Sequence, residues 1–288
     1  MTRTSVPGLS RRSVLFGLLA VLAAPRTRAW SASGHRITGE IATALLTPSA
    51  RSQLRELIGS QELALVANYM DEERAALALS YPGSPSWHYD DRPVCAGDTP
   101  YAQYCPAGNC GTAQVNRWSS LLADGAADPH QRAFAIRLLV HVVSDLHQPL
   151  HAANNADQGG NQIQVLLPGS SQPQKLHKVW DVDFVDFATR GSSEPAYAAR
   201  LLAQYAGDIP TWQHGSVTDW AAETYELALR VAYHPLPGFA CNWSAVKPIA
   251  LPEAYVAGAV AIIPRQLARA GARIAFVLNS ALDPADAA

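Results

Sequence analysis

The sequence predicts an all-α protein built as one mostly helical domain. Apolar residues recur with a helical period in several long segments, whereas only one short segment alternates as a strand does. The 288 residues are 48% hydrophobic and 16% charged, which excludes a disordered chain and suits one large domain. No internal repeat or long linker divides the chain, and no apolar run reaches the ~18 residues that a membrane-spanning helix needs.

The first 29 residues are typical of a cleaved signal peptide. Arg11 and Arg12 precede an apolar stretch over residues 14–24, and Thr27 and Ala29 supply the small residues that signal peptidase requires. The Arg-Arg pair also resembles a twin-arginine export signal. We expect residues 1–29 to be removed, leaving one domain over residues 30–288 with a loose tail from about residue 281. A secreted or periplasmic location follows; an uncleaved amphipathic arm is the alternative.

Helical periodicity in the remaining chain predicts helices at residues 35–46, 131–146, 195–205, 218–233 and 252–278. The second is apolar on nearly every side, as a central buried helix would be, and Pro264 predicts a kink in the last. Loops rich in Pro, Gly and Ser are expected at residues 81–112, 168–174 and 235–250. Polar and apolar residues alternate over 161–167, which predicts one arm of a short β-hairpin.

The four cysteines form an even set, which suits the oxidising compartment that export implies. Sequence alone allows three pairings. The short loop between Cys105 and Cys110 favours a local disulfide, and the long-range bridge is then Cys95–Cys241. A zinc site made of these thiols is the competing hypothesis, but the sequence has no C-x-x-C pair and offers better ligands elsewhere.

Residues 141–151 concentrate chemistry in an otherwise apolar segment. His141 and Asp145 are four residues apart and share one helix face, and His147 and His151 follow. Pro149 breaks the helix, which lets His151 point in a different direction. A buried imidazole beside a buried carboxylate is costly unless both are satisfied, and a divalent metal ion satisfies both. A hydrogen-bonded core pair is the alternative.

His177 and Asp181 repeat the same spacing, and single histidines stand at His35 and His88. Taken alone, His177 and Asp181 could be an ordinary surface pair, and His35 or His88 could be a packing or surface residue. Taken together, neutral imidazoles and carboxylates are ligands that zinc accepts, and there are enough of them for more than one ion. The remaining histidines are expected to be structural or on the surface: His130, His147, His214 and His234. Among them, His147 could orient a metal ligand through a hydrogen bond.

Six motifs occur in order along the chain: Trp30-x4-His35, Asp71-x2-Arg74, WHY at 87–89, HxxxDxHQPLH at 141–151, GGN at 159–161 and LHxxWD at 176–181. Together they resemble the zinc-dependent single-strand nucleases and 3′-nucleotidases of fungi, plants and some bacteria. The resemblance covers essentially the whole mature chain.

The resemblance implies three zinc ions in a cleft of an all-α fold that bacterial zinc phospholipase C shares. The first ion would be held by the free α-amine and carbonyl of Trp30, by His35 and by Asp145 as a bridge. The second would be held by Asp71, His88, His141 and Asp145, and the third by His151, His177 and Asp181. An α-amine within a peptide bond has no lone pair to give, so cleavage after Ala29 would complete the first site.

The resemblance also implies a mechanism and a substrate. The metal ions would activate a water for in-line attack on phosphorus, with Asp71 orienting it and Arg74 holding a non-bridging oxygen. Single-stranded DNA and RNA would be cut to products with 5′-phosphates, and 3′-nucleotides would be hydrolysed. Tyr89 would stack on a base, Asp91 or its neighbour Asp90 would bind the base edge, and Asn161 would line the cleft. A monomer without a stable membrane anchor is expected.

Charge is compatible with this function. Removal of residues 1–29 takes away five of the 22 basic residues and no acidic residue, which leaves 17 against 24 and a formal charge of −7. Three Zn²⁺ would add six positive charges, so phosphate would meet metal ions, not the basic face of an ordinary nucleic-acid-binding domain. The family pattern is altered at positions that are not predicted ligands, namely Ser31, Tyr69, Met70 and Ser144.

Two other functions fit parts of the sequence. A zinc phospholipase C would act on lipid head groups, but such enzymes typically have Glu at the position of Asp181 and lack the two disulfides. A non-catalytic exported zinc-binding protein would use the same residues with closed coordination.

Overall fold

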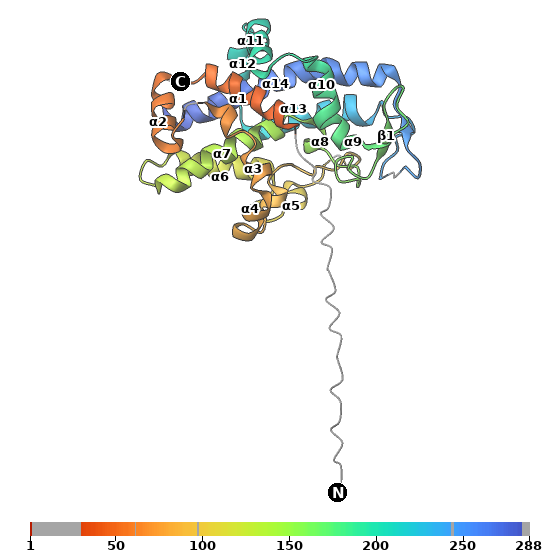
Figure 1. Cartoon of the computed structure of the whole chain (residues 1–288), viewed down its shortest axis with the longest axis horizontal. Helices are drawn as coiled ribbons and strands as arrows, with labels where there is room; N and C mark the ends of the chain where they lie inside the picture. Colours follow the sequence, from red (N-terminus) through yellow and green to blue (C-terminus); the bar gives the residue numbers. More distant parts are fainter. Residues whose placement is uncertain (2–29, 61, 97, 243–244, 284–288) are drawn as a thin grey trace.

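The computed structural model describes residues 1, 30–60, 62–96, 98–242 and 245–283, which fold into a mostly helical domain with a small sheet (Figure 1). The predicted signal peptide lies outside these residues, apart from residue 1. The α-helices are α1 (Ala32–Ala44), α2 (Pro48–Ile58), α3 (Tyr69–Glu72), α4 (Arg74–Ser80), α5 (Tyr101–Tyr104), α6 (Gly111–Ala123), α7 (Pro129–Asp145), α8 (Pro149–Ala152), α9 (Leu176–Lys178), α10 (Phe184–Thr189), α11 (Glu194–Gln204), α12 (Ile209–Trp212), α13 (Val217–Leu227) and α14 (Glu253–Leu282). Short 3₁₀ turns are η1 (Leu63–Leu65), η2 (Ser84–Ser86) and η3 (Pro106–Gly108), and π-helical segments are η4 (Val179–Asp183) and η5 (Ala228–Tyr233).

The five predicted helices are present, and capping side chains mark the starts of α1, α7 and α13. The side chain of Ser31 accepts a hydrogen bond from the Gly34 amide, so α1 begins three residues before the predicted start. Asp128 caps α7, and Pro129 occupies its first turn. The predicted helix at 218–233 is α13 continued by η5. Helix α14 continues to Leu282 with Pro264 inside it. Of the tail predicted from about residue 281, residues 284–288 lie outside the described residues.

The sheet has one more strand than the predicted hairpin. Strand β1 (Gln164–Leu166) pairs antiparallel with β2 (Gln174–Lys175), which makes the hairpin. Strand β3 (Ile249–Ala250) pairs parallel with β1, giving the order β2-β1-β3. The loop expected at 235–250 therefore ends in an edge strand, which is too short to show alternation in the sequence.

The core consists of two hydrophobic clusters that meet along α1 and α14. The first gathers around Trp180, Phe184 and the N-terminal half of α14. The second gathers around α6, α7 and the C-terminal end of α14. Helix α14 runs along the long axis of the molecule (Figure 1), and α1 packs directly on it. Their approach requires Gly271, because a Cβ there would lie 2.5 Å from Cβ of Ile41.

Two disulfides tie the loops to this core. Cys105 is bonded to Cys110, and Cys95 to Cys241, which is the pairing that the sequence favoured. The second bridge joins residues 146 positions apart and fastens the loop before α5 to the segment before β3. Among the described residues, no helix combines the length and the apolar character needed to cross a bilayer.

Candidate metal centre

The C-terminal end of α7 carries the first polar pair of the site. His141 and Asp145 are fully buried, and His141 Nε2 lies 3.2 Å from Asp145 Oδ2. The helix is apolar on almost every other buried position because it passes through the second hydrophobic cluster. Isolated charges in such surroundings cost several kcal/mol, so this pair needs partners from other elements.

Asp145 is surrounded by imidazoles. His35, on α1, places Nε2 3.2 Å from Asp145 Oδ1, and His88, between η2 and α5, places Nδ1 2.9 Å from Oδ2. Burial alone would raise the pKa of Asp145, but His141 and His35 hold it well below its usual value. In turn Asp145 overcomes the effect of burial on His141 and raises the pKa of that imidazole to about 9. The electrostatic field at this point therefore favours a cation.

Backbone carbonyls orient three of the histidines. A carbonyl oxygen can only accept, so each Nδ1 that contacts one carries a proton, and Nε2 is the nitrogen that offers a lone pair when the ring is neutral. These contacts run from His141 Nδ1 to Ala67 (2.7 Å), from His151 Nδ1 to His88 (2.7 Å) and from His177 Nδ1 to Gly159 (2.6 Å).

The free nitrogens of His151 and His177 point at each other. Their Nε2 atoms are 3.1 Å apart, and Asp181 Oδ2 lies 3.3 Å from His177 Nε2. Burial lowers the pKa of His151 to about 3 and that of His177 to about 4, so neither ring takes a second proton near neutral pH. Two lone pairs at this distance repel, and a bound cation would turn the repulsion into coordination. The residues therefore fit a metal ion.

Several unsatisfied buried atoms belong to the predicted ligands. Within the described part of the chain, no hydrogen bond reaches either ring nitrogen of His35, Oδ1 of Asp145 or Oδ2 of Asp181. A buried polar atom left in this state costs about 1–3 kcal/mol, and native proteins keep few of them. Metal ions bound to these atoms would satisfy them.

The structure assembles three groups of donor atoms, and the atoms of each lie within 4.8 Å of one another. The groups are His35 with Asp71 and His141; His88 with His141 and Asp145; and His151 with His177 and Asp181. The last is the set that the sequence resemblance implied. The first two groups contain the other side chains that were expected to bind metal. They differ from the expectation in one respect: Asp71 lies with His35, although these two residues were expected to bind different ions.

Trp30 lies beside this centre. Its indole is fully buried and donates to the carbonyl of Ser144 at 2.9 Å, next to Asp145. The amide of Ser31 donates to the carbonyl of Asp181 at 2.7 Å. The main chain at Trp30 is thus fixed to the two segments that carry Asp145 and Asp181. In the full-length chain its nitrogen is still bonded to Ala29.

The other predicted site residues surround the donor groups. Arg74 begins α4, and its charge adds to the effect of burial in lowering the pKa of His88 and His177. Tyr89 is half-buried. Asp91 is also half-buried, and burial, followed by neighbouring carboxylates, raises its pKa to about 6. Asn161 donates to the carbonyl of Gln158 at 2.9 Å.

Several residues that orient the ligands were not identified from the sequence. Gln148 Nε2 donates to Asp181 Oδ1 at 2.6 Å. Asp157, only 1% exposed, accepts hydrogen bonds from the Gly160 amide and the Tyr233 hydroxyl, each at 3.0 Å. It thereby fixes the turn whose Gly159 carbonyl orients His177. Gln148 lies inside the 141–151 motif and could have been found there, whereas the role of Asp157 depends on the folded turn.

His147 occupies the same motif but is engaged elsewhere. Its Nδ1 donates to the Val143 carbonyl at 2.7 Å, and its Nε2 accepts from Arg273 at 3.0 Å. Both nitrogens are used, so His147 is a structural residue, as expected.

Residues 30–283 match the S1/P1 Nuclease family. The chain belongs to this family. Relatives match over most of their length. Endonuclease 3 of Arabidopsis thaliana is 25% identical, covering 87% of this chain and 88% of the relative. Nuclease P1 of Penicillium citrinum and nuclease PA3 of a Penicillium species are 26% and 27% identical, each covering 87% of this chain and 97% of the relative.

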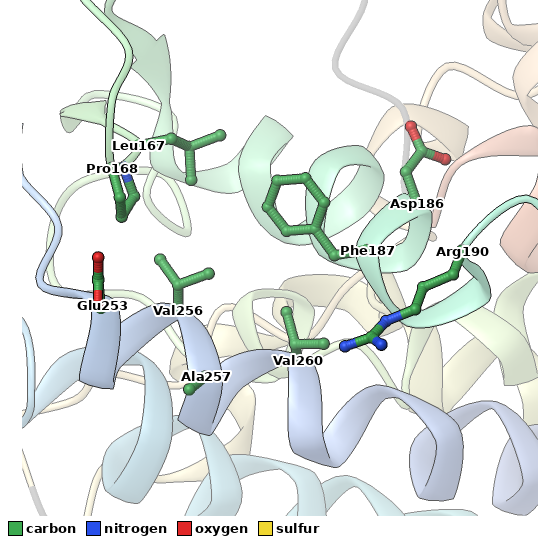
Figure 2. A pocket seen from close by; sticks show the side chains of 9 residues that line it. All are labelled: Leu167, Pro168, Asp186, Phe187, Arg190, Glu253, Val256, Ala257 and Val260. Carbon is green, nitrogen blue, oxygen red and sulfur yellow. The ribbon is translucent and has the colours of Figure 1, made fainter.

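Membership in the S1/P1 nuclease family makes the chain a hydrolase of phosphodiester bonds. The three buried His/Asp groups are consistent with a trinuclear centre. A groove of about 630 Å³ lies between α10 and α14 and is lined largely by Leu167, Phe187, Val256 and Val260 (Figure 2). It contains none of the candidate ligands, so it is separate from this centre.

Proposed function

We propose that this chain is an exported endonuclease with three zinc ions, which cuts single-stranded DNA and RNA to 5′-phosphorylated products and also acts as a 3′-nucleotidase. The observation that carries the proposal is the 3.1 Å approach of the Nε2 atoms of His151 and His177. Both rings have committed their Nδ1 protons to carbonyls, so both present lone pairs to one point.

Zinc is the metal that suits these donors best. Neutral imidazoles and carboxylates, with no free thiol among the described residues, are borderline ligands that zinc accepts at four- or five-coordinate sites. We assign Trp30, His35 and Asp145 to the first ion. The second ion would be held by Asp71, His88, His141 and again Asp145. The third would be held by His151, His177 and Asp181. The short distances from Asp145 to three imidazoles support its role as a bridge.

When bound, zinc would supply Lewis acidity and lower the pKa of a water from 15.7 to about 7. The protein residues would do the rest. Asp71 is the only half-buried member of the three donor groups, so it is accessible to orient the attacking water. Arg74, three residues later, would hold a non-bridging phosphate oxygen as negative charge develops.

Substrate binding would use the segment that follows His88. Tyr89 would stack on an unpaired base, a contact worth about 1–3 kcal/mol that a duplex does not offer. Asp91 would bind the base edge and Asn161 would line the cleft. The pKa of Asp91, raised to about 6, lets this carboxyl donate or accept a hydrogen bond near neutral pH.

Export would complete the centre. Trp30 is fixed to the segments of Asp145 and Asp181 through its indole and the next amide. Cleavage after Ala29 would give it a free α-amine at that position. The two disulfides support an oxidising destination, secreted or periplasmic.

The test is hydrolysis by the mature, zinc-loaded protein. We expect release of 5′-phosphorylated products from single-stranded DNA and RNA, release of phosphate from 3′-nucleotides, slower cutting of duplex DNA, loss of all activities with a chelator and about three zinc ions per chain. His141→Ala should abolish activity, whereas His130→Ala, on the exposed start of the same helix, should not. A protein that hydrolyses lecithin but not nucleic acid would instead be a phospholipase. A protein that binds zinc but hydrolyses neither substrate would be a zinc-binding protein.

A further inference from the structure

Residues 152–160 join two parts of the third donor group, which consists of His151, His177 and Asp181. The segment begins directly after His151, and near its end the carbonyl of Gly159 accepts the 2.6 Å hydrogen bond that orients the ring of His177. We call this segment the connecting turn. Its position decides whether the two imidazoles meet at one point.

The connecting turn has a strained backbone. Ala156 and Gln158 have φ angles of 60° and 57°, and Gly159 and Gly160 follow with 58° and 80°. Glycine adopts this left-handed region readily, whereas any other residue there brings its Cβ close to the following carbonyl. Strain of this kind persists only where surrounding contacts hold the backbone. The turn therefore depends on its attachments to the rest of the protein.

One attachment is made by Asp157. Its amide and that of Gln158 donate to Oδ1 of Asn154, at 3.0 and 3.1 Å, which sets the shape of the turn. The carboxylate of Asp157 accepts a 3.0 Å hydrogen bond from the hydroxyl of Tyr233 on η5. This bond fixes the middle of the turn to the core, and the first residues of the turn are fixed elsewhere.

The second attachment is made by Asn155, which is 1% exposed. Its Nδ2 donates to the carbonyl of Ala240, and its Oδ1 accepts from the amide of Asn242, each at 2.9 Å. These two partners flank Cys241 on an exposed loop. Because a buried amide without hydrogen-bond partners is costly, Asn155 and this loop hold each other in place.

A disulfide keeps the loop at this position. Cys241 is bonded to Cys95, 146 positions away in the sequence. The residue before Cys95 is Val94, whose amide donates to the carbonyl of Asn154 at 3.0 Å. The start of the connecting turn, at Asn154 and Asn155, thus contacts the chain on both sides of the disulfide. Without that bond, no covalent restraint would keep the exposed loop against the turn.

We propose that Asn155 is a positioning residue for the third metal ion, and that the Cys95–Cys241 disulfide makes its action depend on redox conditions. With the disulfide formed, the loop fixes Asn155, and the turn presents the Gly159 carbonyl to His177. In a reducing compartment, two thiols of the cellular pool are oxidised to a disulfide while the Cys95–Cys241 bond is reduced to two thiols. The loop then separates, the strained turn relaxes, and the third ion is no longer held.

The proposal rests on the nuclease function above and adds a safeguard to it. Cytoplasmic thiols keep cysteines reduced, so before export the chain would lack its third ion. The complete centre would form only in the oxidising compartment where the nuclease acts.

Zinc counting tests the proposal in the mature protein. Cys95→Ala combined with Cys241→Ala, and separately Asn155→Ala, should each retain about two ions after dialysis against buffered zinc, because loss of a contact that orients a ligand weakens metal binding about 10- to 100-fold. His177→Ala identifies the ion. The double variant of His177→Ala and Asn155→Ala should also retain about two ions, because both changes empty the same site.

The matched control is Cys105→Ala combined with Cys110→Ala, which removes the other disulfide. Among the described residues, no hydrogen bond joins residues 105–110 to the connecting turn. This variant should keep all three ions. Circular dichroism and the melting temperature establish that each variant is folded.

Three ions in Asn155→Ala would overturn the proposal, as would the loss of an additional ion when His177→Ala is combined with it. Three ions in the folded variant without Cys95 and Cys241 would overturn the redox dependence. If that variant does not fold, reduction of the folded wild-type protein with a thiol, followed by desalting and zinc counting, decides instead. A wild-type protein that binds three ions but hydrolyses no nucleic acid would refute the nuclease function alone, and the zinc counts would still decide on Asn155.

Discussion

The side-chain amide of Gln148 donates a 2.6 Å hydrogen bond to Oδ1 of Asp181, and both residues are almost fully buried. The bond leaves Oδ2, which lies 3.3 Å from His177 Nε2, as the oxygen that would hold the proposed third ion. Gln148 would therefore act through Asp181 on a metal ion bound there.

Gln148→Glu should lower the affinity for one of the three ions. The substitution keeps the shape of the side chain but replaces the donor with an oxygen that repels Asp181. Loss of a hydrogen bond to a ligand typically reduces metal affinity 10- to 100-fold. Zinc counting after dialysis should give about two ions per chain. Gln172→Glu, on the exposed loop between β1 and β2, is the control and should keep three.

An additional residue before Trp30 in the mature protein should remove zinc and activity together. The extra peptide bond takes the lone pair from the nitrogen of Trp30, so the proposed first ion loses a ligand. Metal analysis and single-strand cleavage measure the two effects. Full zinc content in the extended protein would refute the α-amine assignment.

Asp91→Asn should stabilise the protein at pH 8 but not at pH 3.5. The folded-state pKa of Asp91 is about 6, above the value of 3.8 in the unfolded chain. As pH rises from about 4 to 6, the unfolded chain releases a proton that the folded chain keeps, so the wild type loses stability over that interval. Partial exposure limits the loss to about 2 kcal/mol or less. Urea denaturation of the wild type and the variant at both pH values measures this difference in stability. An equal change in stability at pH 3.5 and pH 8 would contradict the raised pKa of Asp91.

Gly271→Ala should destabilise the fold by about 1–3 kcal/mol. The new methyl group would overlap Ile41 and push α1, which carries His35, away from α14. Gly258→Ala, on the same helix, meets no atom within 4 Å and should stabilise by up to about 1 kcal/mol. Thermal denaturation of both variants gives the comparison. Equal melting temperatures would show that the two helices have room to separate.

Five helices were predictable because their apolar period extends over ten residues or more. Helices α2 and α6, with 11 and 13 residues, were not predicted. The first residues of α1 and α7 were harder to predict, because the side chains of Ser31 and Asp128 cap these helices before the apolar period begins. Strand β3 has two residues and exists only because β1 is beside it. Such an element carries almost no local signal.

The donor residues were predictable because histidine and aspartate are rare in buried apolar segments, and the 141–151 and 176–181 motifs mark them. Which of these residues share a metal site was harder to predict from the sequence. Asp71 meets His35 because α3 and α1 pack near the same end of α7, which depends on tertiary structure. The role of Asp157 required the left-handed turn at Gly159 and Gly160, where a side chain at Gly159 would lie 2.4 Å from the Leu150 carbonyl.

The donor groups draw on segments spread from His35 to Asp181, and these segments meet only in the native state. The unfolded chain offers no equivalent cluster, so metal ions bound here would act as crosslinks as well as chemical groups. Each ion at 100 times its dissociation constant would add about 2.7 kcal/mol to the stability of the native state. A chelated chain should therefore be more susceptible to proteases. Scarcity of the metal would then shorten the lifetime of the protein as well as abolish its activity.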